Sequence, residues 1–289
     1  MNAPAATADF VPFPGVSAGV YTRADFDAIR AIVYDTAGIV LAPGKATLVY
    51  SRLAPLVRDS ASKTFAAYVE RIGRDSEERR RAVCALTTNH TFFFRENHHF
   101  EHLAKHVRPT LLSRKSGQGV RIWSAGCSSG EETWSIAMTL LGEDRAEGRS
   151  IARQDLAILA TDLADHALAT ARAGNYPLSS VEPVPQAMRE NWLVERDGKA
   201  SVTAELRAMV SFRMLNLLGD WPMKRAFDVI FCRNVMIYFD QPTKERLIAR
   251  LCERLAPGGF LYIGHSERVT GPASASLSLV GATIYRRDA

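Results

Sequence analysis

The sequence predicts an α/β protein in which a small all-α domain precedes a Rossmann-like sheet domain, and the sheet domain carries a small inserted subdomain. In the first part of the chain, apolar side chains recur at helical spacing, as at Phe26, Ile29 and Val33, without an intervening strand pattern. After the glycines at 117 and 119, short apolar runs alternate with helical stretches, which is typical of parallel strands joined by crossover helices. The length of 289 residues suits about two domains.

The domain bounds follow from where these patterns change. We expect a disordered tail at 1–21, an N-terminal helical domain at 22–95, a linker helix within 96–117 and the sheet domain at 118–289. Thr22 and Ser62 precede helical patterns and are predicted to be N-caps. Between Gly174 and Met209 the alternation gives way to polar, proline-bearing sequence, which is longer than an ordinary loop of about 4 to 6 residues. This stretch predicts the inserted subdomain, at about 174–209.

The elements of the sheet domain are predicted from the apolar runs one by one. Strands are expected at 120–125, 156–161, 210–215, 227–232 and 260–264, and helices at 131–141, 166–173 and 243–255. The final stretch, 277–286, is expected to close the sheet as an antiparallel strand or hairpin.

Composition restricts the class of protein. No apolar run approaches the roughly 20 residues of a membrane span, so no membrane insertion is expected. The Ala- and Pro-rich opening lacks the features of a signal peptide, and the four dispersed cysteines indicate reduced thiols in the cytoplasm. The net charge of +5 favours acidic partners, whether nucleic acid, a membrane surface or an acidic protein.

A glycine-bearing turn follows the first predicted strand and indicates a cofactor site. The sequence WSAGCSSGEET runs from 123 to 133, with Gly126 and Gly130 as the pivots before a helix. Cofactors of doubly wound sheets lie across the carboxyl ends of the strands. The second strand leads to Asp162, which can accept hydrogen bonds from ribose hydroxyls or cap the following helix.

The same turn permits a hydrolase interpretation. Gly126, Ser128 and Gly130 match a nucleophile elbow, and Asp228 and His265 follow in the order of such a triad. An elbow normally lies in mid-sheet after several strands, whereas here only helices precede the first strand, so the hydrolase is the weaker hypothesis.

Four histidines, at positions 98, 99, 102 and 106, have a helical spacing that could hold a metal. No paired carboxylate completes such a site in the sequence. We therefore expect no metal.

Three segments of the chain resemble the chemotaxis receptor methyltransferase family, CheR. They are TTNHTFFFRENHHF at 87–100, WSAGCSSGEET at 123–133 and FCRNVMIYF at 231–239, with AGIVL at 37–41 and GHSE at 264–267 as further matches. The resemblance implies a class I S-adenosylmethionine-dependent methyltransferase domain after the helical domain. It also implies that S-adenosylmethionine is contacted by Asn89, Thr91, Arg95, Glu132, Asp162, Asn216, Leu217, Arg233 and Asn234, and that Arg95 and Tyr238 are catalytic and flank the methyl group.

The activity that the resemblance implies is methylation of glutamate side chains on the cytoplasmic domain of methyl-accepting chemoreceptors. The products would be glutamyl γ-methyl esters and S-adenosylhomocysteine. A glutamate with a pKa of about 4.3 is already ionised at neutral pH, so the reaction requires alignment and no general base. We expect a monomeric cytoplasmic enzyme that binds no nucleic acid.

One region departs from the family pattern, and a second region has a role that the resemblance does not decide. Where the family often has a dense basic face for receptor docking, the helix predicted at 45–58 has only Lys45, Arg52 and Arg58, and Pro55 is expected to interrupt it. The insert corresponds to the subdomain that binds a receptor tether peptide in some members. Two alternatives to the implied activity are a methyltransferase of the same fold with another substrate, and a non-catalytic module that senses the cofactor and docks on receptors.

Overall fold

The computed structural model describes residues 19–113 and 119–288. They form two compact units: a helical unit, which ends at Thr88 and also includes Tyr238–Asp240, and a sheet unit, which contains 89–237 and the residues from Gln241 onward. Most of the predicted tail at 1–21 lies outside the described residues. The sequence-based domain bounds, with a linker at 96–117, divide the chain differently and stay a prediction.

The helical unit is built from amphipathic helices, α1 Arg23–Ala37, α2 Ala46–Asp59, α3 Phe65–Arg74 and α4 Ser76–Leu86, with the 3₁₀ turn η1 Pro43–Lys45. Thr22 caps α1 in a capping box with Asp25, which confirms the first predicted N-cap. The second was wrong, because Thr64 accepts from the Ala67 N–H at 3.3 Å and caps α3. Ser62 belongs to the preceding turn.

Proline does not end α2, which was also predicted wrongly. The helix continues through Pro55 to Asp59. Val49, Leu53 and Val57 are buried on one face, so packing on both sides of the proline offsets its local cost of about 3 kcal/mol.

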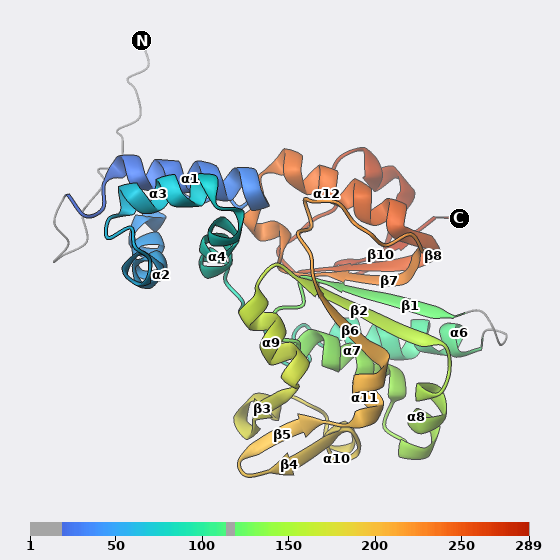
Figure 1. Cartoon of the computed structure of the whole chain (residues 1–289). Coiled ribbons are helices and arrows are strands. Elements are labelled where there is room, and N and C mark those ends of the chain that lie inside the picture. Colours follow the sequence, from blue (N-terminus) through green and yellow to red (C-terminus); the bar gives the residue numbers. More distant parts are fainter. Residues whose placement is uncertain (1–18, 114–118, 289) are drawn as a thin grey trace. The chain divides into compact units, whose positions relative to one another are not determined.

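The sheet unit contains a seven-stranded sheet with the order β6-β2-β1-β7-β8-β10-β9 (Figure 1). Its strands are β1 Val120–Ala125, β2 Leu156–Asp162, β6 Val210–Met214, β7 Phe227–Cys232, β8 Leu255–Ile263, β9 Leu277–Gly281 and β10 Ile284–Arg287. The first five are parallel, whereas β10 runs antiparallel to both β8 and β9. The predicted strands and the closing hairpin are confirmed, although β8 begins five residues before the predicted start at 260.

Helices cover both faces of this sheet, with α12 on one face and α6 and α7 on the other (Figure 1). The bounds are α7 Glu131–Leu141, α8 Arg145–Ala152, α9 Asp165–Ala173 and α12 Gln241–Arg254. Before β1, α5 His98–His102, a π-helical turn at Leu103–Val107 and α6 Arg108–Leu112 form one continuous helical stretch. Every residue of α7 is buried, so the helix that follows the cofactor turn is part of the core.

A small antiparallel sheet lies between α9 and β6. Its strands have the order β3-β5-β4. The elements are β3 Asn175–Pro177, η3 Leu178–Val181, α10 Gln186–Trp192, β4 Leu193–Arg196, β5 Lys199–Val202 and α11 Ala204–Met209. Trp192 is fully buried and donates its indole N–H to the Gly142 carbonyl at 2.7 Å, which anchors this sheet to the end of α7.

No helix within 19–113 or 119–288 is both long and apolar enough to cross a membrane.

Candidate functional site

Half of the predicted site residues lie where parallel strands end. Asp162 ends β2, Asn216 and Leu217 follow β6, and Arg233 and Asn234 follow β7. Since β1, β2, β6 and β7 are parallel neighbours, their carboxyl ends meet at one edge of the sheet, which we call the carboxyl edge. This edge is where doubly wound sheets bind cofactors.

The segment 89–96 is fastened to the carboxyl edge by hydrogen bonds. Ser128 donates its hydroxyl to the Asn89 carbonyl at 3.1 Å, and the Phe94 N–H donates to Ser135 Oγ at 3.0 Å. The Arg233 guanidinium donates to the Arg95 carbonyl. The parts of the first and third motifs at 89–100 and 231–237 therefore lie together within the sheet unit.

The turn from β1 to α7 has a backbone that only particular residues permit. Gly126 and Gly130 have φ values of +86° and +97°, and Ser128 has a φ of 48°. A Cβ atom at Gly130 would lie 2.8 Å from the Cβ of Ala171, so no larger residue fits there. The Ser128 N–H donates to Asp162 Oδ2 at 2.7 Å, which joins this turn to the end of β2.

Asp162 is suited to bind hydroxyl groups. Its Oδ1 accepts from the Ala164 N–H at 2.9 Å, and the Leu163 N–H also bonds to this carboxylate. A carboxylate offers about four acceptor positions, so with the Ser128 bond one position remains for a ligand. Burial raises the pKa of Asp162, although the backbone N–H groups of Ala164 and Ser128 act in the opposite direction. The N-cap of α9 is Ala164, so the alternative role of Asp162 as a helix N-cap was wrong. These features fit a ribose-binding carboxylate.

Arg233 lies between two carboxylates in the interior. The residue is 5% exposed, and its guanidinium lies 3.1 Å from Glu132 Oε2 and 3.4 Å from Glu96 Oε2. Glu132 also accepts from the Ser124 hydroxyl at 2.8 Å. Burial raises the pKa of Glu132, and Arg233 opposes that effect. Glu96 is not among the residues predicted from the sequence, where its one signal is its place directly after Arg95.

Asn234 is fixed by hydrogen bonds from its backbone and its side chain to two carboxylates. Its φ is 58°, its N–H donates to Glu267 Oε2 at 3.1 Å, and its side-chain amide donates to Glu96 Oε1 at 3.4 Å. Glu267 also accepts from the N–H groups of Gly264 and Met236, at 2.6 and 2.7 Å. Burial raises the pKa of Glu267, and the surrounding N–H groups oppose that effect. Glu267 thus fixes the loop after β7.

The two predicted catalytic residues belong to different units. In the sheet unit, Arg95 donates to the His90 carbonyl at 3.0 Å, and its guanidinium lies 5.7 Å from the ring centroid of Phe92. In the helical unit, the Tyr238 hydroxyl donates to the Thr88 carbonyl at 3.4 Å. Their joint action on the methyl group stays a prediction.

The remaining predicted contacts have diverse surroundings. Asn89 lies 3.4 Å from the His166 ring, measured between Nδ2 and Nε2. Thr91 is half-buried, Asn216 accepts from the Leu218 N–H at 3.0 Å, and Leu217 is buried.

The proposed hydrolase triad is not assembled. Asp228, near the start of β7, accepts from the Arg121 N–H at 2.8 Å, so it lies at the end of the strands opposite to Ser128. The Ser128 hydroxyl donates to Asn89, and His265 Nδ1 lies 3.2 Å from Glu96 Oε1. The three residues therefore contact other partners.

The histidines at 98–106 pack against the closing hairpin and β8. His99 is fully buried with Nε2 2.9 Å from the Thr283 hydroxyl, and His102 Nδ1 lies 2.9 Å from the Tyr262 hydroxyl. Burial lowers the pKa of both, that of His99 to about 3. Across the described ranges, no three His, Cys, Asp or Glu side chains are grouped to hold a metal ion.

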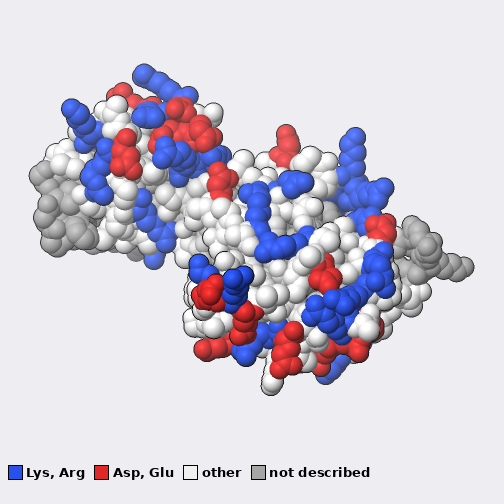
Figure 2. All heavy atoms as spheres, turned by 60° about the horizontal axis from the view of Figure 1, so that its bottom comes forward, with Lys and Arg blue, Asp and Glu red and all other residues white. Residues whose placement is uncertain are grey.

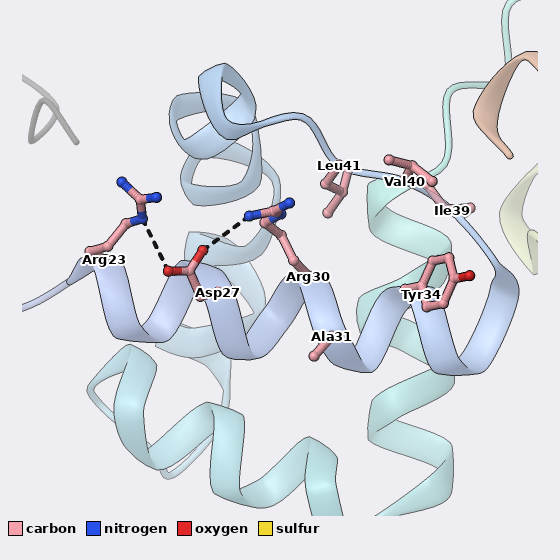
Figure 3. A pocket seen from close by; sticks show the side chains of 8 residues that line it. All are labelled: Arg23, Asp27, Arg30, Ala31, Tyr34, Ile39, Val40 and Leu41. Atoms are coloured by element: carbon pink, nitrogen blue, oxygen red, sulfur yellow. Dashed lines mark hydrogen bonds and ion pairs between the residues drawn. The ribbon is translucent and has the colours of Figure 1, made fainter. Parts of the chain in front are cut away.

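The helical unit has a shallow groove of about 520 Å³ over α1 (Figure 3). Asp27 forms ion pairs with Arg23 and Arg30, at 3.0 and 3.1 Å, while Val40 and Tyr34 are exposed. None of the eight lining residues is a predicted site residue. Acidic and basic side chains are interspersed on the face shown in Figure 2, so this view shows no uniformly basic docking surface.

Comparisons with known proteins identify the family of this chain. Residues 89–285 match the model of the CheR methyltransferase SAM-binding domain, and residues 24–87 match that of the CheR methyltransferase all-alpha domain. The chain is 47% identical to a probable chemotaxis protein methyltransferase of Rhizobium etli, over 88% of this chain and 96% of that protein. It is 43% identical to chemotaxis protein methyltransferase 2 of Pseudomonas aeruginosa, over 92% and 93% of the two chains. The identity is 37% with the chemotaxis protein methyltransferase of Escherichia coli, over 91% and 90%. This chain therefore belongs to the CheR family of methyltransferases, and its cofactor is S-adenosylmethionine.

Proposed function

We propose that this methyltransferase esterifies glutamate side chains of chemoreceptors, producing glutamyl γ-methyl esters and S-adenosylhomocysteine. The observation that carries the proposal is the likeness to chemotaxis protein methyltransferases over about nine-tenths of the chain. The acceptor would be the receptor's cytoplasmic domain, so the enzyme would act in the cytoplasm. Its proposed oligomeric state is the monomer. The net charge of +5 favours approach to an acidic receptor surface.

The carboxyl edge supports a specific set of cofactor contacts. We assign the ribose hydroxyls to Asp162, whose oxygens retain acceptor capacity. The other proposed contacts are Asn89, Thr91, Arg95, Glu132, Asn216, Leu217, Arg233 and Asn234. The buried carboxylates of this set suit a positively charged ligand, because opposite charges attract strongly where water is excluded.

The chain's own contribution to the reaction is alignment. When bound, S-adenosylmethionine supplies a methyl group that is activated by its sulfonium. The acceptor carboxylate is ionised at neutral pH, so no side chain has to remove a proton. Arg95 can orient a carboxylate through its planar guanidinium, which the His90 carbonyl and the Phe92 ring hold in place. Tyr238 would present its hydroxyl beside the reacting oxygen.

The proposal is tested by incubating a purified receptor cytoplasmic fragment with the enzyme and methyl-labelled cofactor. We expect label on the receptor that is released as methanol at alkaline pH, because esters hydrolyse and N-methyl groups do not. Arg95→Lys should lower the rate by about tenfold or more, since lysine lacks the planar fork. The matched control is Arg153→Lys, at an exposed arginine after α8.

Two outcomes would contradict the proposal. Label that resists alkali would indicate a methyltransferase with another kind of acceptor group. Cofactor binding without transfer to any receptor fragment would favour the non-catalytic docking module.

A further inference from the structure

Glu96 is the residue that joins the elements of the carboxyl edge. Its carboxylate is 11% exposed, and it contacts groups from two other segments. Oε2 lies 3.4 Å from the Arg233 guanidinium, while Oε1 accepts from the Asn234 amide at 3.4 Å and lies 3.2 Å from His265 Nδ1. One carboxylate therefore connects the segment after Arg95 with the loops after β7 and β8.

The backbone around Glu96 is strained. Seven of the described non-glycine residues have positive φ, and four of them lie in segments at the carboxyl edge: Phe94, Glu96, Ser128 and Asn234. Such backbone costs about 1 to 3 kcal/mol per residue and persists only where surrounding contacts hold it. Glu96 and Asn234 both have a φ of 58°, and their side chains bond to each other. Their hydrogen bond thus fixes two strained residues at once.

Asn234 is also packed closely against Gly264, which leaves its side chain no space to move in that direction. A Cβ atom at Gly264 would lie 2.5 Å from Asn234 Nδ2 and 2.9 Å from Glu267 Oε2. Glu267 binds the Asn234 backbone N–H, so backbone and side chain are held by two different carboxylates. Only the side-chain contact depends on Glu96.

The charges around Glu96 favour its ionised form. Burial raises the pKa of Glu96, but Arg233 and the contacts with His265 outweigh burial and lower it. His99 Nδ1 lies 3.7 Å from Glu96 Oε2, yet burial keeps that imidazole neutral by lowering its pKa to about 3. Arg233 and Arg95, whose Nε lies 4.0 Å from Glu96 Oε1, are therefore the permanent positive charges beside Glu96.

We propose that Glu96 is a positioning residue of the methyltransferase site, which holds Arg233 and Asn234 in the orientation that binds S-adenosylmethionine. The inference rests on the proposed function, in which Arg233 and Asn234 contact the cofactor. Glu96 acts through these two residues. It also keeps Arg95 in place, because Arg233 donates to the Arg95 carbonyl and forms an ion pair with Glu96, and Glu96 Oε1 lies 4.0 Å from Arg95 Nε.

Calorimetric titration with S-adenosylhomocysteine tests this role without requiring a receptor. Glu96→Gln keeps the shape of the side chain but removes the charge opposite Arg233. We expect its dissociation constant to rise on the order of tenfold, as for other residues that orient ligand-binding groups. Glu96→Asp retains the charge on a shorter stem and should lie between Glu96→Gln and the wild type. Glu101→Gln is the matched control, because Glu101 is exposed on α5 and bonds to Asn97; its affinity should equal that of the wild type.

The outcomes separate this inference from the proposed function. A wild-type protein that is folded but does not bind S-adenosylhomocysteine would overturn the cofactor site, and the role of Glu96 with it. Wild-type affinity in Glu96→Gln would overturn the positioning role alone. Affinity is measured at temperatures where circular dichroism shows each variant folded, so a lower melting temperature with unchanged affinity also contradicts positioning. If Glu96→Gln does not fold, the comparison is made with Glu96→Asp, whose wild-type affinity would equally contradict the proposal.

Discussion

Each unit of the molecule buries a glutamate against arginine, but the two clusters are built differently. In the helical unit, Glu78 accepts from the Tyr68 hydroxyl at 2.9 Å and pairs with Arg71 and Arg81, at 3.2 and 3.1 Å. Both arginines are partly exposed, with side-chain exposures of 38% and 50%. Water can solvate them, and the carboxylate is fully satisfied. This cluster joins α3 to α4.

In the sheet unit, one fully buried arginine faces two carboxylates. Among the described residues, Arg233 Nε and Glu96 Oε2 are buried atoms that lack a hydrogen-bond partner, and strained backbone lies beside them. A cluster built for stability alone would satisfy such atoms, because each unsatisfied one costs about 1 to 3 kcal/mol. The contrast indicates that the helical cluster is structural and that the cluster at the carboxyl edge is functional.

Arg233→Met should have the largest effect, because it leaves Glu132 buried without its cation and removes the nearer of the two arginines beside Glu96. We expect the free energy of unfolding to fall by about 3 to 5 kcal/mol, measured by urea denaturation, together with loss of S-adenosylhomocysteine binding. A loss below about 1 kcal/mol would mean that the two carboxylates are solvated after all.

Glu78→Gln should have a moderate effect on stability and none on the site. It removes charge-assisted hydrogen bonds, so we expect the free energy of unfolding to fall by about 1 to 3 kcal/mol. Affinity for S-adenosylhomocysteine, measured on the folded variant, should stay at the wild-type value. A large loss of affinity would break the distinction between the two clusters.

The smallest predicted effect concerns pH. Burial lowers the pKa of His99 from 6.5 to about 3. Below pH 6.5, the His99 imidazole is therefore protonated in the unfolded chain but stays neutral in the folded chain. Stability should therefore decrease as the pH drops from 6.5 toward 3. His99→Gln removes this contribution, so between pH 7 and 5.5 the wild type should lose about 1 kcal/mol more than the variant. If the stability of the two proteins depends equally on pH, His99 binds its proton in the folded protein as readily as in the unfolded chain, and the prediction is wrong.

The sequence identified the parts of this molecule that depend on local pattern. Strand positions were predictable from apolar runs, and the parallel arrangement then brought Asp162, Asn216, Arg233 and Asn234 to one edge. The choice of Thr64 over Ser62 as a helix cap was not predictable, since both residue types can cap, and the φ of 58° that excludes Lys63 from the helix is known only from the structure. Likewise, Pro55 remains within α2 because of tertiary packing, and helix propensities describe only local preferences.

The role of Glu96 was hidden for a related reason. Its partners Arg233, Asn234 and His265 lie far away in the sequence, and no spacing rule connects them to it. Only the fold reveals that one carboxylate faces all three. Tyr238 illustrates the same limit, because its contacts with Thr88 and Val40 place it in the helical unit although its neighbours in sequence follow β7.

The carboxyl edge is proposed to bind the cofactor. Calorimetric titration of S-adenosylhomocysteine into the wild type, Asp162→Ala and Asp165→Ala tests this proposal. The last variant is the control, because Asp165 is exposed in the first turn of α9. We expect binding by the wild type and the control, and affinity weakened by about tenfold or more in Asp162→Ala, which loses charge-assisted hydrogen bonds. Wild-type affinity in folded Asp162→Ala, or no binding by folded wild-type protein, would contradict this proposal.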